Sequence, residues 1–380
     1  MENLLTNFNN HVRKWSITSE MTVEFTLKYS TDIFNLANQN LINHCQSARQ
    51  IIIIDRNVYN LYCNDTNLYF QKYQIELSIL ILDVTEEDKN WETTNQVLKF
   101  FEDKSLLRRE TVFAIGGGVL LDLVGFCCSI YRRGVPYIKI PTTLLAIVDA
   151  SVGVKVAINH FDRRNRVGSY YPPIETLIDK KFIKTQDERN IVNGIAEIFK
   201  LAIIKDIELF ELLEESYEQL INEKFQFGAV PTRVINLAIT GMVEELSPNL
   251  WERKLERCVD FGHSFSPIIE MKNVKTLQHG EAVVLDCLLS SCLSFNLGYL
   301  TKNDLNRIFK TAKNLKLPLF HKDFCDFDLL KAALTDTMKH RNSNQYLPVP
   351  VGIGNYKILN DITDKQIVEA ANLFENYNNE

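Results

Sequence analysis

Two histidines and one glutamate in the second half of this 380-residue chain have the chemistry of a catalytic metal site. Glu197 lies in the stretch NGIAEIFK, His263 in FGHSF and His279 in QHGE. Two imidazoles and one carboxylate leave a coordination position open for substrate oxygens, as in catalytic zinc sites. Spacing alone does not establish the set, because the three residues are far apart and a lone histidine is more often structural. Lys200 shares a helical face with Glu197, where a surface ion pair is the alternative interpretation.

A run of three glycines, Gly116, Gly117 and Gly118, joins the strand-like segment TVFAI to an apolar helical run. Glycines let backbone N–H groups approach a pyrophosphate closely, and a helix N-terminus favours its charge. The run is not GxGxxG, so a tight strand-to-helix turn is an equally good interpretation. Asp55 ends an earlier strand, where it either accepts hydrogen bonds from an adenosine ribose or caps the next helix.

Basic residues gather after the glycine run, in a chain whose net charge is -6. Arg132 and Arg133 come first, then Lys155, then the stretch RRNR at residues 163–166. Such a cluster suits a substrate phosphate, although charge runs on loops are usually solvated surface. The acidic balance of the whole chain gives no basic footprint for nucleic acid, and we expect no nucleic-acid partner.

The elements that must position these residues differ between the two halves of the chain. Short β-branched or apolar runs, separated by helix-permissive stretches, occupy residues 49–55, 76–83, 111–115 and 137–140. This alternation predicts parallel βαβ units with the active crevice at the carboxyl ends of the strands. Apolar-periodic, helical segments dominate from about residue 185, over 191–220, 230–246, 280–296 and 304–315. We therefore expect an α/β + α fold: a Rossmann-like parallel α/β domain over residues 1–182, then a mostly helical metal-binding domain over 183–380.

The sequence contains few signals that indicate a cellular compartment. The eight cysteines are scattered and form no CxxC pair, which argues against a zinc ribbon or a thioredoxin-like site. No apolar run approaches the roughly 18 residues that a membrane span requires. The polar segment 1–10 lacks the pattern of a signal peptide. These features predict a reduced, cytoplasmic protein without a membrane partner.

Six segments together resemble the dehydroquinate synthase superfamily, in its order and spacing. They are GGGVLLDLVGF at 116–126, YRRGVPYIKIPTTLLAIVDASVGVK at 131–155, NRVGSYYPP at 165–173, NGIAEIFK at 193–200, GHSF at 262–265 and HGEAV at 279–283. The resemblance extends from about residue 50 to about residue 362. It implies a two-domain α/β plus α fold, a homodimer, bound NAD and a divalent metal, usually zinc or cobalt.

The resemblance also assigns residues, motif by motif. Glu197, His263 and His279 match the metal ligands. The NAD site is matched by Gly116, Gly117, Gly118, Asp122, Thr142 and Thr143, with Asp55, Asn57, Glu86 and Lys89 as more distal contacts. The substrate-binding set is matched by Arg133, Asp149, Lys155, Asn165 and Lys200.

Four positions depart from the pattern of dehydroquinate synthases. Asp260 stands where they have Asn, Pro267 where they have a second His, and Arg164 where they have Lys. His340 stands where they have a Lys that suits the carboxylate of their substrate. Its replacement suggests a substrate without a carboxylate, which argues against dehydroquinate synthesis.

The departures at Asp260, Pro267 and His340 resemble the branch of the superfamily that acts on sedoheptulose 7-phosphate. The segments VGVK, SYYPP and HRNSNQYLPVPVGIG look most like 2-epi-5-epi-valiolone synthases. Desmethyl-4-deoxygadusol synthases, which use the same substrate, are the alternative. 3-Dehydroquinate synthase and metal-dependent alcohol dehydrogenase are the more distant ones.

The resemblance implies a phosphate-eliminating cyclase. The substrate would be oxidised transiently by NAD, lose its phosphate, be reduced again and close into a carbocycle by an intramolecular aldol step, so that NAD is not consumed. We expect Arg133, Lys155 and Asn165 to hold the phosphate and Lys200 to bind the oxidised centre. Asp260 and His340 are expected to steer which conformer of the opened chain cyclises.

Overall fold

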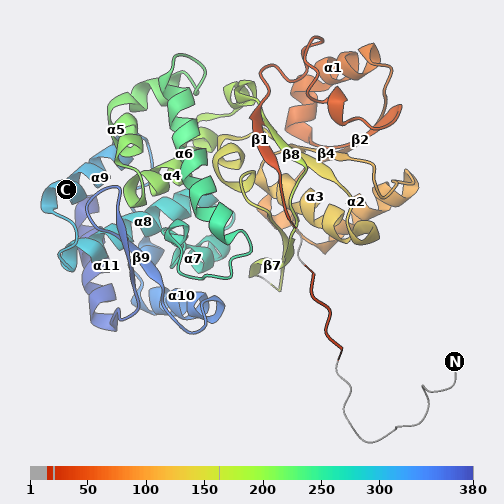
Figure 1. The fold of residues 1–380 in the computed structure, drawn as a ribbon. Coiled ribbons are helices and arrows are strands. Elements are labelled where there is room, and N and C mark those ends of the chain that lie inside the picture. The colour runs from red at the N-terminus through yellow and green to blue at the C-terminus, as the bar shows by residue number, and fades with distance from the viewer. Residues whose placement is uncertain (1–14, 20–21, 162, 380) are drawn as a thin grey trace, which may run out of the picture.

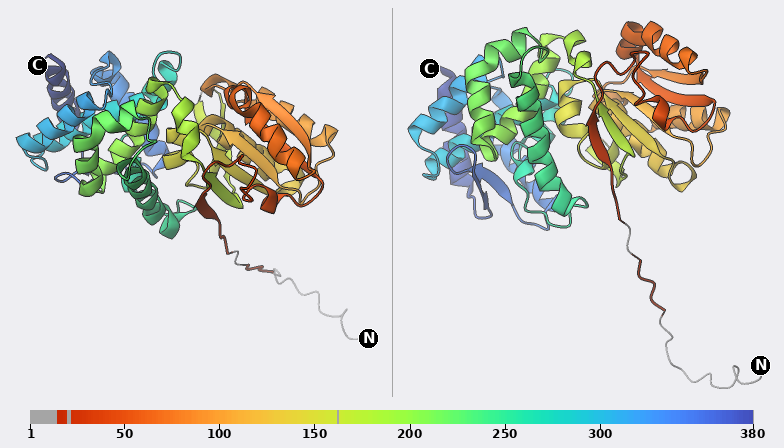
Figure 2. Two further views of the ribbon diagram at one scale, coloured as in Figure 1. Left: turned by 90° about the horizontal axis from the view of Figure 1, so that it is seen from above. Right: turned by 45° about the horizontal axis from the view of Figure 1, so that its top comes forward.

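The computed structural model describes residues 15–19, 22–161 and 163–379 of the chain. Segment 1–10, for which we expect no signal peptide, lies outside the described residues. An α/β body and a mostly helical body stand side by side, and they remain so in two further views (Figures 1 and 2). This arrangement confirms the expected α/β + α fold.

A six-stranded parallel sheet forms the α/β body, with the strand order β1-β8-β5-β4-β2-β3. Its strands are β1 (Thr26–Tyr29), β2 (Arg49–Asp55), β3 (Glu76–Leu82), β4 (Val112–Gly116), β5 (Tyr137–Pro141) and β8 (Glu175–Ile178). The sequence predicts β2, β3, β4 and β5 to within one residue. It does not predict β1 and β8, because each has only four residues and no continuous apolar run.

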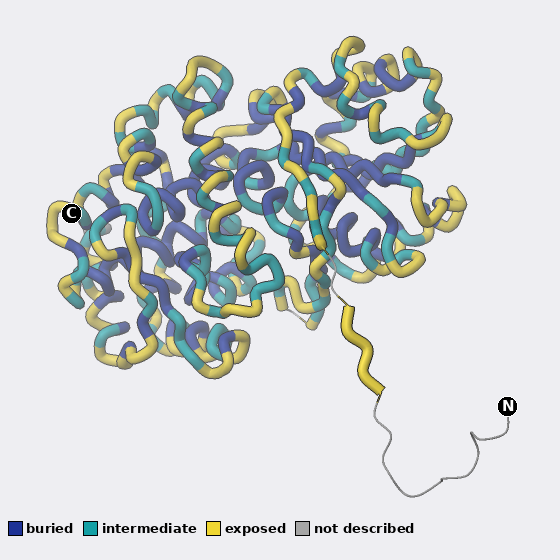
Figure 3. The backbone as a smooth tube through the Cα atoms, in the orientation of Figure 1, coloured by how far each residue is buried: buried dark blue, intermediate teal, exposed yellow. Residues whose placement is uncertain are grey.

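Isoleucines of β2 cover both faces of the sheet. Ile51 and Ile53 join one apolar cluster with α2 (Trp91–Asp103) and α3 (Gly118–Ile130). Ile52 and Ile54 join the opposite cluster with α1 (Arg56–Lys72). In a parallel sheet the crossover helices pack on both faces. A central strand therefore needs apolar side chains on both faces, and its sequence is continuously apolar. The central strands β2, β4 and β5 are buried and appear dark blue in Figure 3, whereas the edge strand β1 is mostly exposed.

The helical body is built around α8. It contains α4 (Glu188–Ile204), α5 (Ile207–Asn222), α6 (Val230–Leu246), α7 (Ser266–Lys272), α8 (His279–Asn296), α9 (Lys302–Asn314), α10 (Phe327–His340) and α11 (Asp364–Asn379), with a hairpin of β9 (Leu347–Pro350) and β10 (Tyr356–Leu359). Every side chain of α8 from Ala282 to Ser294 is buried. The run predicted over 191–220 is two helices, because the Asp206 carboxylate accepts the Leu209 N–H and caps α5.

An antiparallel hairpin of β6 (Lys155–His160) and β7 (Arg163–Tyr170) packs against α3 and reaches α7. In Figure 1, β7 lies at the lower edge of the junction between the two bodies. The π-helical turn η4 (Ala146–Ala150) also crosses the junction, since Ile147 and Val148 pack in the core of the helical body. These two segments carry residues of the α/β half into the site.

A short 3-10 helix at the predicted domain boundary, η5 (Lys180–Thr185), contributes to the apolar clusters of both bodies. Phe182 belongs to the cluster under α1, whereas Ile183 belongs to the core of the helical body. The boundary between residues 182 and 183 stays a prediction.

All eight cysteines lie within the described residues and are free thiols. Across residues 15–19, 22–161 and 163–379, no helix is long and apolar enough to cross a membrane. The cytoplasmic location stays a prediction.

Lys139 in β5 is fully buried, and its Nζ donates hydrogen bonds to the carbonyls of Ala150 and Gly153, each at 2.9 Å. These two bonds hold the segment that carries Asp149. Burial lowers the pKa of Lys139 to about 8, because a low-dielectric interior disfavours the charged ammonium.

The lowered pKa of Lys139 predicts a pH-dependent contribution to stability. The unfolded chain keeps this proton up to about pH 10.5, whereas the folded chain releases it above about pH 8, so stability rises with pH between these values. At 1.36 kcal/mol per unit, the free energy of unfolding of the wild type should gain about 2 kcal/mol relative to Lys139→Met between pH 8 and pH 9.5. Urea titrations of both proteins across this range would measure it. A constant difference would contradict the prediction.

Candidate active site and metal centre

Three elements of the helical body bring the predicted metal ligands together. Glu197 projects from α4, His263 from the loop before α7, and His279 is the first residue of α8. Glu197 Oε1 lies 3.3 Å from His279 Nε2 and 3.8 Å from His263 Nε2, and the two imidazole centres are 5.4 Å apart. One ligand atom from each of the three lies within 4.8 Å of the others.

The donor set fits a divalent metal. Within the described part of the chain, Glu197 Oε1 is buried without a hydrogen-bond partner, although both Nε2 atoms face it. Buried polar atoms are nearly always satisfied, so an unsatisfied carboxylate oxygen between two imidazole nitrogens calls for a cation. Burial alone would raise the pKa of Glu197, but the charges of Lys200, His279 and His263 hold it well below the usual range.

The two histidines have different electrostatic surroundings. Burial and the neighbouring Lys200 lower the pKa of His263 to about 3, which keeps its ring neutral and able to bind a metal. Burial and Arg164 would lower the pKa of His279, yet Glu270 and Glu197 raise it to about 9. A metal that bound His279 would therefore compete with a proton for the ring.

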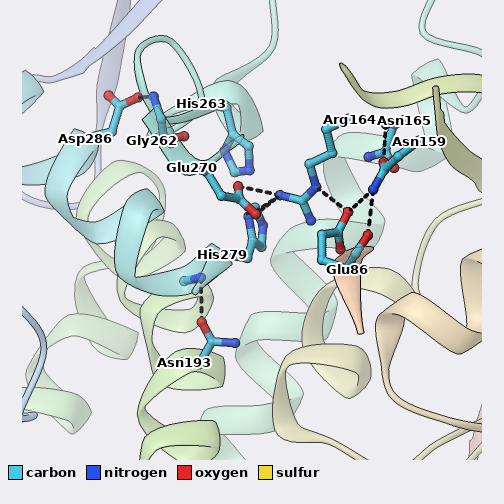
Figure 4. A network of polar contacts seen from close by, with 12 residues as sticks. Glu86, Asn159, Arg164, Asn165, Asn193, Gly262, His263, Glu270, His279 and Asp286 are labelled. Carbon is cyan, nitrogen blue, oxygen red and sulfur yellow. Dashed lines mark hydrogen bonds and ion pairs between the residues drawn. The ribbon is translucent and has the colours of Figure 1, made fainter. Parts of the chain in front are cut away.

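Close packing around α8 fixes both histidines. Gly280 N donates to Asn193 Oδ1 at 2.5 Å, and a Cβ at Gly280 would lie 2.2 Å from the Asn193 carbonyl, so only glycine lets α8 approach α4 this closely. Asp286, on α8, accepts the N–H groups of Phe265 at 2.6 Å and of Ser266 at 2.9 Å, which ties the His263 loop to the helix. Figure 4 shows these ties around His279.

Lys200 and Asp149 lie beside the predicted metal ligands. Lys200 is 2% exposed, and its Nζ lies 2.5 Å from Glu197 Oε2, so the surface ion pair considered from the sequence is in fact buried. Burial and the charge of Glu197 raise the pKa of Asp149, against the lowering effect of Lys200. Both residues, which are predicted to bind the substrate, therefore lie next to the three predicted metal ligands.

The predicted dinucleotide residues line the carboxyl ends of β2, β4 and β5. Gly116 ends β4, Gly117 precedes α3 and Gly118 begins it. The Thr142 N–H donates to the Gly116 carbonyl at 3.0 Å, and Thr143 follows it. The loop that the sequence predicts thus lies next to both threonines.

The more distal NAD residues join the substrate set in one polar network. Lys89 is 2% exposed, and its Nζ lies 2.6 Å from both Asp122 Oδ2 and Asn165 Oδ1. Glu86 accepts a hydrogen bond from the Asn159 side chain at 2.9 Å.

Asp55 caps α1. Its Oδ1 accepts the N–H groups of Asn57 at 2.9 Å and of Val58 at 3.3 Å. The capping interpretation of Asp55 is therefore confirmed, and a ribose contact of Asp55 and Asn57 stays a prediction.

Asp260 forms the centre of a second charged cluster. Arg257 lies 2.6 Å from its Oδ1 and Arg341 3.3 Å from its Oδ2. Arg257 also pairs with Glu252, which lies 2.8 Å from Lys155 Nζ. The cluster joins β6 to the His263 loop.

Two predicted residues lie apart from this assembly. His340 is exposed, and its Nε2 is 3.5 Å from Arg166. The buried neighbour Arg341, not His340, contacts Asp260. Arg133 is exposed just beyond the end of α3. With 13 residues in α3 and a rise of 1.5 Å per residue, Arg133 lies roughly 20 Å from the glycine loop. No polar partner of Arg133 is found among the described residues.

Glu270 and Arg341 are not among the site residues predicted from the sequence, and Arg164 is predicted only as a departure from the family pattern. Glu270 Oε2 lies 3.0 Å from His279 Nδ1, and Arg164 NH1 lies 2.5 Å from the same oxygen. The available signal for Glu270 is a single acidic residue that follows Pro267, Ile268 and Ile269 in the stretch SPIIE, shortly after His263. The sequence gives no signal for Arg341, because it is the last of three consecutive basic residues, and such a run normally indicates solvated surface.

Two family models match consecutive parts of the chain. The 3-dehydroquinate synthase N-terminal model matches residues 79–193, and the 3-dehydroquinate synthase C-terminal model matches residues 194–340.

Individual relatives cover nearly the whole chain. A 2-epi-5-epi-valiolone synthase of Streptomyces albus is 40% identical, over 96% of this chain and 92% of the relative. A demethyl-4-deoxygadusol synthase of Trichormus variabilis is 35% identical, over 92% of this chain and 87% of the relative. Among solved structures, ValA, a 2-epi-5-epi-valiolone synthase from Streptomyces hygroscopicus subsp. jinggangensis with NAD+ and Zn2+ bound, superimposes with a TM-score of 0.92 at 41% identity. That match covers 96% of this chain and 100% of ValA.

Proposed function

Because the chain belongs to the 3-dehydroquinate synthase family, we propose that it converts sedoheptulose 7-phosphate to 2-epi-5-epi-valiolone with release of phosphate. The enzyme is an NAD- and metal-dependent cyclase. The observation that carries the proposal is the buried cluster of Glu197, His263 and His279, with its unsatisfied Glu197 oxygen, in a chain that matches valiolone synthases over nearly its full length.

The cofactor sites follow from the residues on each body. Glu197, His263 and His279 would hold the divalent metal, zinc in the first instance because ValA binds it. The glycine loop, Asp122, Thr142 and Thr143 would hold NAD, with Asp55, Asn57, Glu86 and Lys89 further along it. When bound, the metal supplies a Lewis acid and NAD a temporary hydride acceptor.

The chain's own side chains supply the charges around the substrate. Lys200 carries three N–H donors and uses one on Glu197, which leaves the others for an oxygen that gains negative charge. Asp149, whose pKa is raised by burial and by Glu197, can hold a proton inside the site. Asn165 and Lys155 would bind the phosphate, and Lys155 would exchange its contact with Glu252 for it.

Asp260 and Arg341 support a substrate without a carboxylate. Their ion pair, together with the pair of Arg257 and Glu252, forms a cluster of two guanidinium groups and two carboxylates at a place where dehydroquinate synthases differ in sequence. Since both guanidinium groups already pair with these carboxylates, the four side chains leave little positive charge for a substrate carboxylate. His340 would act on specificity only through Arg166 or after a change of rotamer.

Demethyl-4-deoxygadusol synthesis is the second candidate. The relative of that name is 35% identical, against 40% for the valiolone synthase of Streptomyces albus, and the lower identity makes it the less favoured product.

We also propose a homodimer and a cytoplasmic location. Arg133 supports the dimer, because it is exposed, has no polar partner among the described residues and would be available to a substrate bound by a second copy of the chain.

Incubation of the purified protein with sedoheptulose 7-phosphate, a catalytic amount of NAD and Zn2+ should release one phosphate per substrate without net NADH. Mass and NMR spectra should identify the product as 2-epi-5-epi-valiolone. NADH that accumulates would instead indicate a dehydrogenase, and a demethyl-4-deoxygadusol spectrum would select the second candidate. The absence of phosphate release would contradict the proposal.

A further inference from the structure

The His279 ring has polar neighbours on both of its nitrogen atoms. Nε2 faces the Glu197 oxygen that lacks a hydrogen bond, on the metal side of the ring. On the opposite side, Nδ1 lies 3.0 Å from Glu270 Oε2. The Glu270 residue is only 3% exposed, so its carboxylate is sheltered from water. A metal-binding imidazole commonly donates its second N–H to such a carboxylate, which fixes the ring's tautomer and orientation.

We propose that Glu270 is the positioning residue of the metal site: it accepts the Nδ1 hydrogen of His279 and thereby leaves the Nε2 lone pair free for the metal. This inference rests on the proposed function, because it presumes that Glu197, His263 and His279 bind a metal. Glu270 itself touches neither metal nor substrate in this role.

Arg164 makes the choice of tautomer critical. Its NH1 lies 2.7 Å and 2.5 Å from the two Glu270 oxygens, and also 2.6 Å from His279 Nδ1. A guanidinium can only donate hydrogen bonds. If it donated to Nδ1, the ring hydrogen would sit on Nε2 and block the metal. Arg164 and Glu270 therefore favour opposite tautomers, and the ionised Glu270 carboxylate decides between them by engaging both donors.

The pair also spans the two bodies of the chain. Arg164 comes from β7, its Nε lies 3.4 Å from Glu86 Oε1 in the α/β body, and Glu270 comes from α7 in the helical body. Figure 4 shows Arg164 lying between the two carboxylates, with His279 beneath Glu270. The orientation of His279 thus depends on contacts that Arg164 makes across the junction between the two bodies.

Glu270→Gln tests the proposal with nearly the same shape and no charge. A neutral amide is a weaker acceptor for the Nδ1 hydrogen and holds Arg164 less firmly, so Arg164 turns toward Nδ1. We expect zinc affinity, measured by competition with a chromophoric chelator, to fall by about 10- to 100-fold. The visible spectrum of the Co2+-substituted protein should change as well, because it reports ligand geometry.

Glu281→Gln is the matched control. Glu281 lies two residues after His279 and pairs with Arg189, at 2.7 Å, but does not contact the His279 ring. Its replacement removes an arginine–carboxylate pair from the same helix end while Gln keeps the capping box. Zinc affinity and the cobalt spectrum should stay those of the wild type.

The double variant Arg164→Met/Glu270→Gln removes both members of the Arg164–Glu270 pair and leaves Glu86 its hydrogen bond from Asn159, so it should fold even where a single variant does not. It should still bind zinc at least about tenfold more weakly than the wild type, because the Nδ1 carboxylate is gone. Wild-type zinc affinity and an unchanged cobalt spectrum in Glu270→Gln, or in the double variant, would overturn the inference. Wild-type zinc affinity in Glu197→Gln would overturn the metal site itself, so the two failures are distinguishable.

Discussion

Glu197→Gln should lose its metal and turn over at least about a thousandfold more slowly than the wild type. Glu197 is one of the three predicted metal ligands, and its Oε1 has no hydrogen-bond partner within the described residues. Loss of a Lewis acid removes several kcal/mol of charge stabilisation, and about 4 kcal/mol corresponds to a thousandfold in rate. Metal analysis after dialysis and a phosphate-release assay measure the two effects.

The same substitution should also destabilise the metal-free protein. Lys200 is buried beside Glu197, and a buried charge that loses its partner costs about 3–5 kcal/mol. His263→Ala separates the two consequences, because it removes a ligand but leaves the Lys200–Glu197 pair intact. It should lose zinc and turnover with a smaller drop in the metal-free unfolding midpoint. Retained zinc in both variants would contradict this assignment of the ligands.

Lys200→Met should bind NAD as the wild type does and lose about 100- to 1,000-fold in turnover. The ammonium lies 2.5 Å from Glu197, on the metal side of α4, and removing one positioned donor from a developing negative charge has an effect of this size. In this variant the ionised Glu197 carboxylate has lost its Lys200 partner. Zinc binding should therefore raise the melting temperature of the variant more than it raises that of the wild type. Calorimetric NAD titrations, phosphate release and thermal melts with and without zinc test these outcomes.

Lys205→Met is the matched control for Lys200→Met. Lys205 caps the same helix and pairs with Glu245 at 2.8 Å, away from the metal ligands. Partly exposed pairs contribute at most about 1 kcal/mol, so stability should change little and turnover should not change. Unchanged turnover in Lys200→Met would remove Lys200 from the reaction.

Most of the fold could be predicted because the elements carry strong periodic signals. The apolar run of β2 is buried on both faces, and α6 matches its predicted segment to the residue. The two short strands β1 and β8 escape prediction, since their pairing depends on contacts far along the chain rather than on local pattern. The break before α5 could have been predicted from Asp206, which is a standard helix cap.

The site was predictable where a motif carried it, and not where only tertiary structure creates the contact. Glu197, His263 and His279 meet as the family motifs imply. Glu270 and Arg164 are 106 residues apart, and only the packing of β7 against α7 makes them partners. The sequence likewise gives no means to choose between the adjacent His340 and Arg341, because the end of α10 determines which of them turns inward.

All three predicted metal ligands, and the carboxylate behind His279, belong to the helical body, whereas the glycine loop belongs to the other. Because no predicted ligand comes from the α/β body, we expect the ion to stay bound while one sugar is exchanged for the next. Zinc would be acquired once per protein lifetime rather than once per turnover. In a cell short of zinc, newly made chains would then be the first to lack activity, and older ones would continue to work.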